Sequence, residues 1–137
     1  MVIKKIKGIK RFILVDSLGI ILHNRVEPAN TSEKTGARLL LSGLKPLFNK
    51  LTTIFADGGY LSGKLSNQIK NYGFDLTIVK RNCKSFKVLP KRWIVERTFG
   101  WFNRFRRLSK NYESRVQISE LVMQLSMIRI MLNRLVN

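Results

Sequence analysis

A short apolar run that ends in an acid and two glycines constrains the fold of this chain more than any other feature. Residues 52–56 read TTIFA and are followed by Asp57 and the glycine pair. Such a run predicts a buried strand, and the glycines predict a sharp turn after it. Because apolar residues recur at helical spacing over 37–47 and again over 61–72, the strand is expected to lie between two helices.

The remaining patterns extend this alternation. The strand patterns lie at 11–15, 20–26, 52–56 and 75–80, and two further helical patterns lie at about 92–108 and 118–135. Asp16 separates the first two strands and predicts a hairpin, while Asn30 and Glu33 have the spacing of a capping box. The order ββαβαβαα predicts an α/β fold. Its strand–helix–strand unit implies parallel pairing, and the hairpin at one end makes the sheet mixed.

Positive charge is the strongest compositional signal. The chain has 26 Lys and Arg residues against 8 Asp and Glu, a formal net charge of +18, which predicts a nucleic acid as partner. The candidate phosphate contacts are Lys10, Arg11, Lys80, Arg81, Arg92, Arg97, Arg104, Arg106 and Arg107. A solubilising surface or a ribosomal-type RNA binder remains an alternative from charge alone.

Composition also indicates the cellular compartment of the protein. The chain has a single cysteine, Cys83, so it cannot form an internal disulfide. It also lacks the run of about eighteen apolar residues that would predict a membrane span. The basic N-terminus lacks the apolar segment of a secretion signal. We therefore expect an intracellular protein with no membrane partner, and the length of 137 residues fits one domain.

Two of the acids lack an evident structural reason. Asp57 stands at the end of the apolar strand, where ligands bind in open α/β sheets. Glu96 is the acid in the basic stretch between Lys80 and Lys110, on a helix that is apolar over much of its girth. The structural alternatives are an Asp–Gly turn and an ion pair between Glu96 and Arg92. Two such carboxylates fit a Mg²⁺ site for phosphoryl transfer, for which a third ligand would be expected.

Four segments carry a resemblance to a known family. They are KGIKRFILVDSLGIIL near the N-terminus, FADGGY at 55–60, LPKRWIVERTFGWFNRFRRL at 89–108 and QLSMIRIMLNRL in the last helix. Together they resemble the catalytic domain of bacterial insertion-sequence transposases of the DDE class. The resemblance implies a ribonuclease H-like fold, Mg²⁺ or Mn²⁺ as cofactor, and cleavage and joining of double-stranded DNA at transposon ends and target. It also implies a place in the bacterial cytoplasm, at the nucleoid.

The resemblance assigns roles by position. Asp57 matches the family's second catalytic aspartate and Glu96 its catalytic glutamate, and both would be metal ligands. Arg92 matches the arginine that precedes this glutamate. Two positions depart from the family, because Leu89 stands where a tyrosine is common and Asn103 where a lysine is common.

The family's first catalytic aspartate lies on a strand that precedes the first matching segment. This chain contains no such strand, and Asp16 matches a position in the hairpin instead. Because the strand is central in a ribonuclease H-like sheet, its absence would leave two strand edges unpaired. We therefore expect residues 1–137 to be a single, N-terminally truncated catalytic domain that needs an N-terminal fragment to supply the strand.

Three functions follow from these observations. The leading prediction is DNA transposition, with the isolated chain incomplete. The alternatives are an inactive transposase remnant and a non-catalytic basic DNA-binding module. A homo-oligomer is compatible with each of them.

Overall fold

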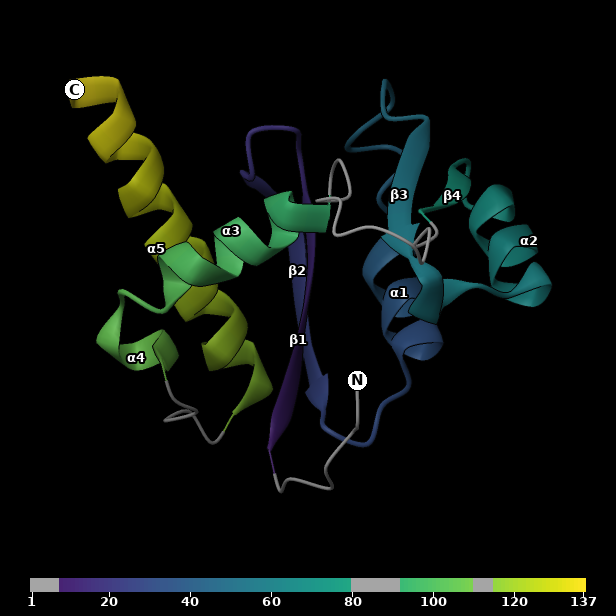
Figure 1. Ribbon diagram of the computed structural model, residues 1–137, viewed down its shortest axis with the longest axis horizontal. Helices are drawn as coiled ribbons and strands as arrows, with labels where there is room; N and C mark the ends of the chain where they lie inside the picture. Colours follow the sequence, from purple (N-terminus) through teal and green to yellow (C-terminus); the bar gives the residue numbers. More distant parts are fainter. Residues whose placement is uncertain (1–7, 80–91, 110–114) are drawn as a thin grey trace, which may run out of the picture. The chain divides into compact units, whose positions relative to one another are not determined.

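The computed structural model describes residues 8–79, 92–109 and 115–137, which form two compact units (Figure 1). The hairpin unit comprises Met1–Thr31 and Ile94–Asn137, and the crossover unit comprises Ser32–Trp93. Each unit holds two paired strands together with helices. Within the three described ranges, no helix has both the length and the apolar character that crossing a membrane needs.

The hairpin unit is built on two antiparallel strands, β1 (Ile9–Val15) and β2 (Ile21–Pro28). The predicted turn residue Asp16 closes the hairpin. Its Oδ1 accepts the backbone N–H groups of Leu18 and Ile20, each at 2.9 Å. An aspartate that binds its own downstream backbone in this way stabilises the turn, so the hairpin prediction is confirmed.

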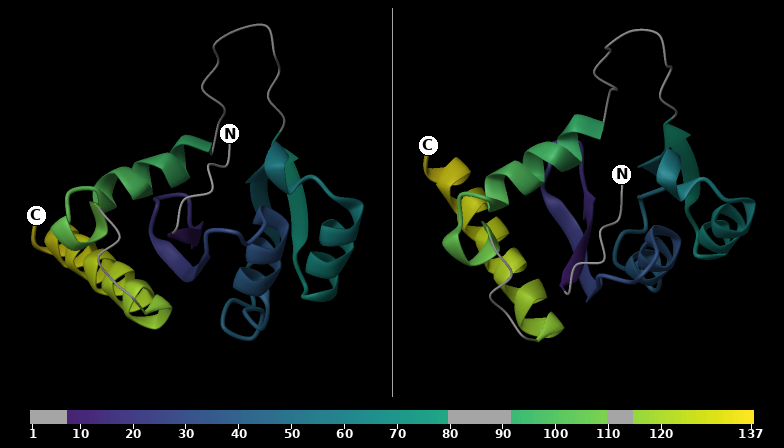
Figure 2. Two further views of the ribbon diagram at one scale, coloured as in Figure 1. Left: turned by 90° about the horizontal axis from the view of Figure 1, so that it is seen from below. Right: turned by 60° about the horizontal axis from the view of Figure 1, so that its bottom comes forward.

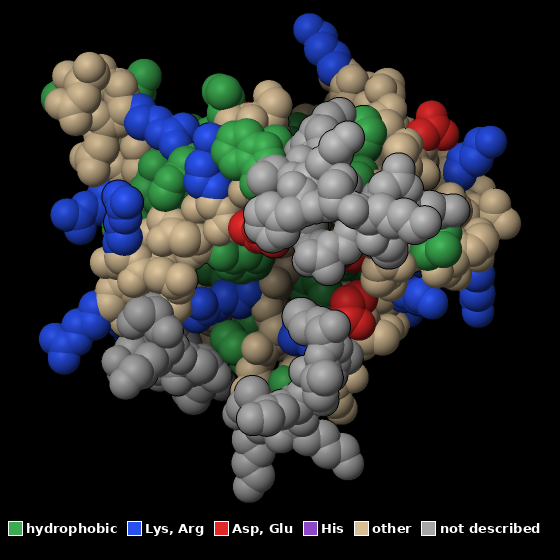
Figure 3. Space-filling model, viewed as in Figure 1, with side chains coloured by type: hydrophobic (Ala, Val, Ile, Leu, Met, Phe, Trp, Pro, Cys, Tyr) green, Lys and Arg blue, Asp and Glu red, His purple; other side chains and the backbone are tan. Residues whose placement is uncertain are grey.

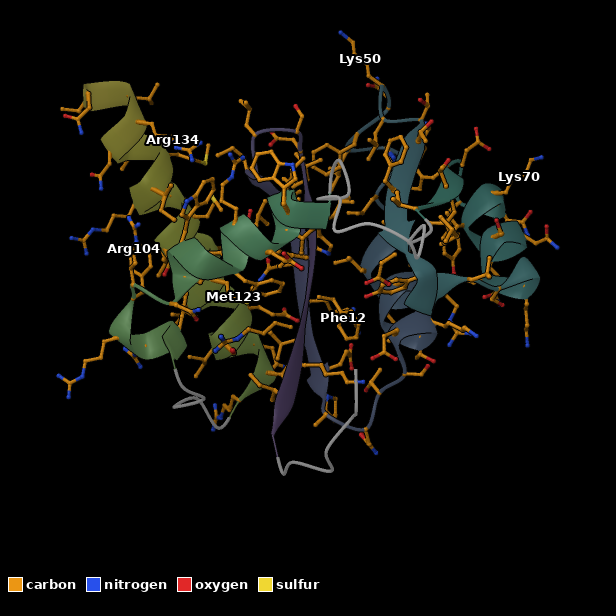
Figure 4. The ribbon with its side chains drawn as sticks, in the orientation of Figure 1. Phe12, Lys50, Lys70, Arg104, Met123 and Arg134 are labelled. Carbon is orange, nitrogen blue, oxygen red and sulfur yellow. The ribbon has the colours of Figure 1, made fainter. Side chains whose placement is uncertain are left out.

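The helices of this unit are α3 (Arg92–Phe102), α4 (Arg106–Ser109) and α5 (Val116–Val136). Helix α5 packs against β2 (Figure 2). The buried core consists of Val26, Phe102, Leu108, Met123 and Met127, and Met123 is labelled in Figure 4. A polar contact also joins the two elements, because the Glu120 Oε1 accepts the backbone N–H of Val26 at 2.8 Å. Helix α5 is therefore fixed to the hairpin by apolar packing and by a hydrogen bond from the β2 backbone to the Glu120 carboxylate.

The crossover unit contains α1 (Glu33–Leu41), β3 (Thr53–Asp57), the 3₁₀ helix η1 (Gly58–Tyr60), α2 (Gly63–Asn71) and β4 (Asp75–Val79). Strands β3 and β4 pair in parallel, and η1 and α2 connect them. Helix α2 packs against both β4 and α1. The buried apolar residues of the unit are Leu40, Leu41, Leu44, Ile54, Leu65, Ile69 and Phe74.

The predicted order of elements is confirmed, with the short η1 and α4 as additions. The antiparallel hairpin and the parallel crossover pair are also confirmed. The described strands form two two-stranded sheets, β1–β2 and β3–β4, and one mixed sheet stays a prediction. Local patterns specify each pairing, but they do not specify whether two pairs join edge to edge.

Two local predictions are wrong. Strand β3 is not a buried strand, since Phe55 is 44% exposed although its neighbour Ile54 is buried. Helix α1 is capped by Ser32 rather than by Asn30, because the Ser32 Oγ accepts the backbone N–H of Thr35 at 3.1 Å. Ser32 stands three residues before that N–H, which is the geometry an N-cap requires.

Candidate functional site

Asp57 is the last residue of β3 and the N-cap of η1. Its Oδ1 accepts the backbone N–H of Gly59 at 3.0 Å, and the residue is exposed. A Cβ at position 59 would lie 3.2 Å from the Asp57 Oδ1, a tight contact, so Gly59 leaves room for the carboxylate. The turn therefore holds one carboxylate oxygen against the backbone and presents the acid at the carboxyl end of a parallel strand.

Tyr60 lies next to this carboxylate and is neutral at physiological pH. Burial of the phenol raises the pKa of Tyr60 to about 12, and the negative charges of Asp57 and Glu33 add to the rise. Ionising this phenol would place a further negative charge near Asp57 in a partly desolvated site. The negative charge at this turn therefore comes from Asp57, and Tyr60 keeps its proton.

Glu96 is exposed on α3, and the residues that follow it fix the helix to the hairpin turn. The Arg97 Nη2 donates to the backbone oxygen of Leu18 at 2.9 Å. The buried Thr98 Oγ1 donates to the backbone oxygen of Gly19 at 2.8 Å. These two hydrogen bonds connect the turn to the middle of α3. The orientation of the helix segment that carries Glu96 therefore depends on the turn.

Replacing Gly19 with Ala is expected to lower the free energy of unfolding by about 2–4 kcal/mol, the sum of a left-handed backbone strain and an overpacked contact. Gly19 has φ +83°, and a Cβ there would lie 2.8 Å from the Thr98 Oγ1. Gly43→Ala is the matched control, because Gly43 has φ +73° and its Cβ would have no neighbour within 4 Å. Urea unfolding of both variants separates the cost of backbone strain from the cost of the close contact with Thr98. Equal losses would contradict a close approach of the turn to α3.

The predicted phosphate contacts have different environments. Lys10, Arg11 and Arg97 donate hydrogen bonds inside the hairpin unit, the first two to Thr31 O at 2.6 Å and Leu108 O at 2.8 Å. Burial lowers the pKa of the Arg11 guanidinium. The exposed candidates are Arg104, Arg106 and Arg107. Lys and Arg side chains are spread over the face shown in Figure 3. The side chain of Arg92, and Lys80 and Arg81 as a whole, lie outside the described residues.

Two arginines of α5 were missed by the sequence patterns. The Arg134 guanidinium lies 4.4 Å from the Trp101 ring centroid, and the Arg129 guanidinium lies 5.9 Å from that of Phe105. The available signal was that both arginines lie off the apolar stripe over 118–135. That signal does not identify the aromatic residues they meet, because Trp101 in α3 and Phe105 between α3 and α4 are distant from both arginines in the sequence.

Carboxylate oxygens are the ligands that Mg²⁺ and Mn²⁺ prefer, so the exposed Asp57 and Glu96 fit such an ion by donor chemistry. Asp57 belongs to the crossover unit and Glu96 to the hairpin unit. Among the residues that the structure describes, no group of three or more His, Cys, Asp and Glu side chains is placed to hold a metal. A site shared by Asp57 and Glu96 stays a prediction.

Comparison with known proteins identifies the family. The family of the transposase DDE domain matches residues 3–131. A protein of Burkholderia cepacia described as a transposase for insertion sequence element IS402 is 30% identical over 119 residues, which are 81% of this chain and 56% of that protein. The chain thus spans about half the length of this curated relative. No solved structure matches the chain. The chain belongs to the DDE transposases of insertion sequences.

Proposed function

We propose that this chain acts in DNA transposition, as part of a domain that cleaves and joins DNA strands at transposon ends. The main observation behind the proposal is the exposed Asp57 carboxylate at the end of β3. It lies in a turn where Gly59, which has no Cβ, leaves room for it. Ligands bind at the carboxyl ends of parallel strands, and this strand end belongs to a chain of net charge +18. Membership of the DDE transposases supports this reaction class.

Asp57 and Glu96 would be the metal ligands of the proposed site. A bound Mg²⁺ or Mn²⁺ would stabilise negative charge on the attacking and leaving oxygens of a phosphoryl displacement. The chain's own residues position DNA, with Arg104, Arg106 and Arg107 as exposed phosphate contacts. Water and then a DNA 3′-hydroxyl are the nucleophiles in this proposal. The protein would act on the bacterial nucleoid, in the cytoplasm.

We further propose that the complete site requires a third carboxylate and a central strand from an N-terminal fragment of the transposase. The length of the relative supports this arrangement, because the chain spans 56% of that protein. A strand with a free edge on each side would join the pairs into a ribonuclease H-like sheet by satisfying their edge N–H and C=O groups.

Cleavage of supercoiled DNA that carries transposon ends tests the proposal. We expect no cleavage by the purified chain alone. Metal-dependent nicking at the ends is expected when the chain is combined with the segment encoded directly upstream. Robust end cleavage by the chain alone would overturn the incompleteness. Salt-sensitive binding without metal dependence or preference for ends would instead identify a non-catalytic DNA-binding module, and an inactive remnant would fail to cleave in either combination.

A second copy of the chain is the proposed oligomeric partner, and the exposed face of α5 supports it. The exposed apolar residues recur at intervals of three and four, at Ile118, Leu121, Leu125, Ile128, Leu132 and Leu135. This is the heptad pattern of a helix–helix seam.

Light scattering after size exclusion tests this pair. We expect the wild-type mass to correspond to two chains, and the mass of Leu125→Gln/Leu132→Gln to correspond to one, because two central apolar side chains of the seam become polar. The control Leu47→Gln/Leu61→Gln changes two exposed leucines of the crossover unit and should leave the pair intact. A wild-type chain that is monomeric at every concentration would rule out the pair.

A further inference from the structure

A pocket of about 410 Å³ lies between the end of α3 and the second half of α5, inside the hairpin unit. Its polar and aromatic lining consists of Arg104, Arg129, Asn133, Arg134, Trp101 and Phe105. Arg104 and Arg134 are labelled in Figure 4. The pocket therefore combines three permanent positive charges with two aromatic rings and one amide.

Two of these arginines are held by ring contacts rather than by acids. The guanidinium of Arg134 lies over the Trp101 ring, and that of Arg129 lies over the Phe105 ring. A cation over a ring face interacts with the π system and leaves its in-plane N–H groups available to an acceptor. Because the rings restrict both guanidiniums, less side-chain entropy is lost when these N–H groups bind a ligand.

The positive charge of the pocket is not balanced within the described fold. In the described ranges, neither Arg104 nor Arg129 nor Arg134 is ion-paired with a carboxylate. A guanidinium fork matches the oxygens of a phosphate, and the Asn133 amide can donate to another oxygen. The Arg97 guanidinium also lies 5.1 Å from the Trp101 ring centroid. The guanidiniums of Arg97 and Arg134 therefore already contact the ring on which a base would stack. These features favour a phosphate group over a base.

We propose that this pocket binds a backbone phosphate of DNA through Arg129 and Arg134. The inference rests on the proposed function, because it takes DNA as the partner. It adds Arg129 and Arg134 of α5, which the sequence patterns did not select, to the candidate phosphate contacts. Arg104, which lines the same pocket, would connect this subsite to the exposed arginines of α4.

The salt dependence of duplex DNA binding tests the subsite, measured by fluorescence anisotropy with the full chain. For Arg129→Gln/Arg134→Gln, the slope of log K against log[salt] should fall by about 0.9, the value for the one phosphate that the variant no longer neutralises. The matched control is Lys50→Gln/Lys70→Gln, which removes the same charge from two exposed lysines of the crossover unit (Figure 4). Its slope should change by less than half as much.

Arg129→Lys/Arg134→Lys is the second variant. This variant keeps the positive charge but removes the planar guanidinium that can donate to two phosphate oxygens at once. The affinity for DNA should therefore fall while most of the salt slope remains. Circular dichroism checks that α5 stays helical in each variant. Equal slope changes in the pocket and control pairs, or a lysine pair that binds as tightly as wild type, would overturn the subsite and leave DNA binding intact. Absence of DNA binding by the wild-type chain would overturn both proposals.

Discussion

Phe102→Ala is expected to lower the free energy of unfolding by about 3–5 kcal/mol, the loss typical of deleting a fully buried aromatic ring. Phe102 is 1% exposed and belongs to the same core as Val26, Leu108, Met123 and Met127. The ring lies at the end of α3, where that helix meets the residues that hold α5 to the hairpin. Its removal should leave a cavity that these elements refill only in part.

Urea unfolding followed by circular dichroism measures this loss. Phe55→Ala is the matched control, because Phe55 is 44% exposed on β3 and its truncation removes less buried area. We expect the loss for Phe55→Ala to be less than half of that for Phe102→Ala. Similar losses would mean that the core of the hairpin unit does not lie where the structure places it.

Asp57→Asn and Glu96→Gln are each expected to reduce end cleavage by at least about 100-fold, in the chain combined with its N-terminal fragment. Removal of groups that only support a metal ligand already costs about 10–100-fold, so loss of a ligand should cost at least the upper value. The asparagine oxygen can still accept the Gly59 N–H, so the Asp57 turn should persist. Its negative charge is lost, which should also lower the raised pKa of Tyr60.

Asp75→Asn is the control for this activity series. Asp75 is an exposed aspartate at the start of β4, opposite Thr53 in the parallel register. It stands at the other end of the strand pair from Asp57, which lies opposite Val79. We expect Asp75→Asn to cleave at the wild-type rate. Unchanged cleavage in both Asp57→Asn and Glu96→Gln would rule out their role as ligands.

Local patterns predicted much of this fold. The Asp16 turn, the strand end at Asp57 and the helix that carries Glu96 were all expected, because each depends on neighbours in the sequence. Local patterns did not show whether the two strand pairs belong to one sheet, since pairing between distant strands has no local signature. The exposure of Phe55 has the same origin, because burial of a strand face depends on what covers it.

The basic residues show a second limit of sequence patterns. Charge alone placed Lys10, Arg11 and Arg97 among the phosphate contacts, yet each donates to a backbone oxygen in the hairpin unit. Their role toward DNA stays a prediction. Conversely, Arg129 and Arg134 were overlooked, because their ring contacts join α5 to Phe105, between α3 and α4, and to Trp101 in α3.

The central claim is that Asp57 and Glu96 bind the same divalent ion, and iron-directed backbone cleavage tests it most directly. Fe²⁺ would replace Mg²⁺ in the chain bound to its N-terminal fragment and to DNA, and peroxide would then generate hydroxyl radicals at the ion. We predict chain breaks at the β3–η1 turn and in α3, both suppressed by excess Mg²⁺ and by Asp57→Asn. Breaks at neither segment, or breaks near Glu96 that Asp57→Asn leaves unchanged, would contradict a shared metal site.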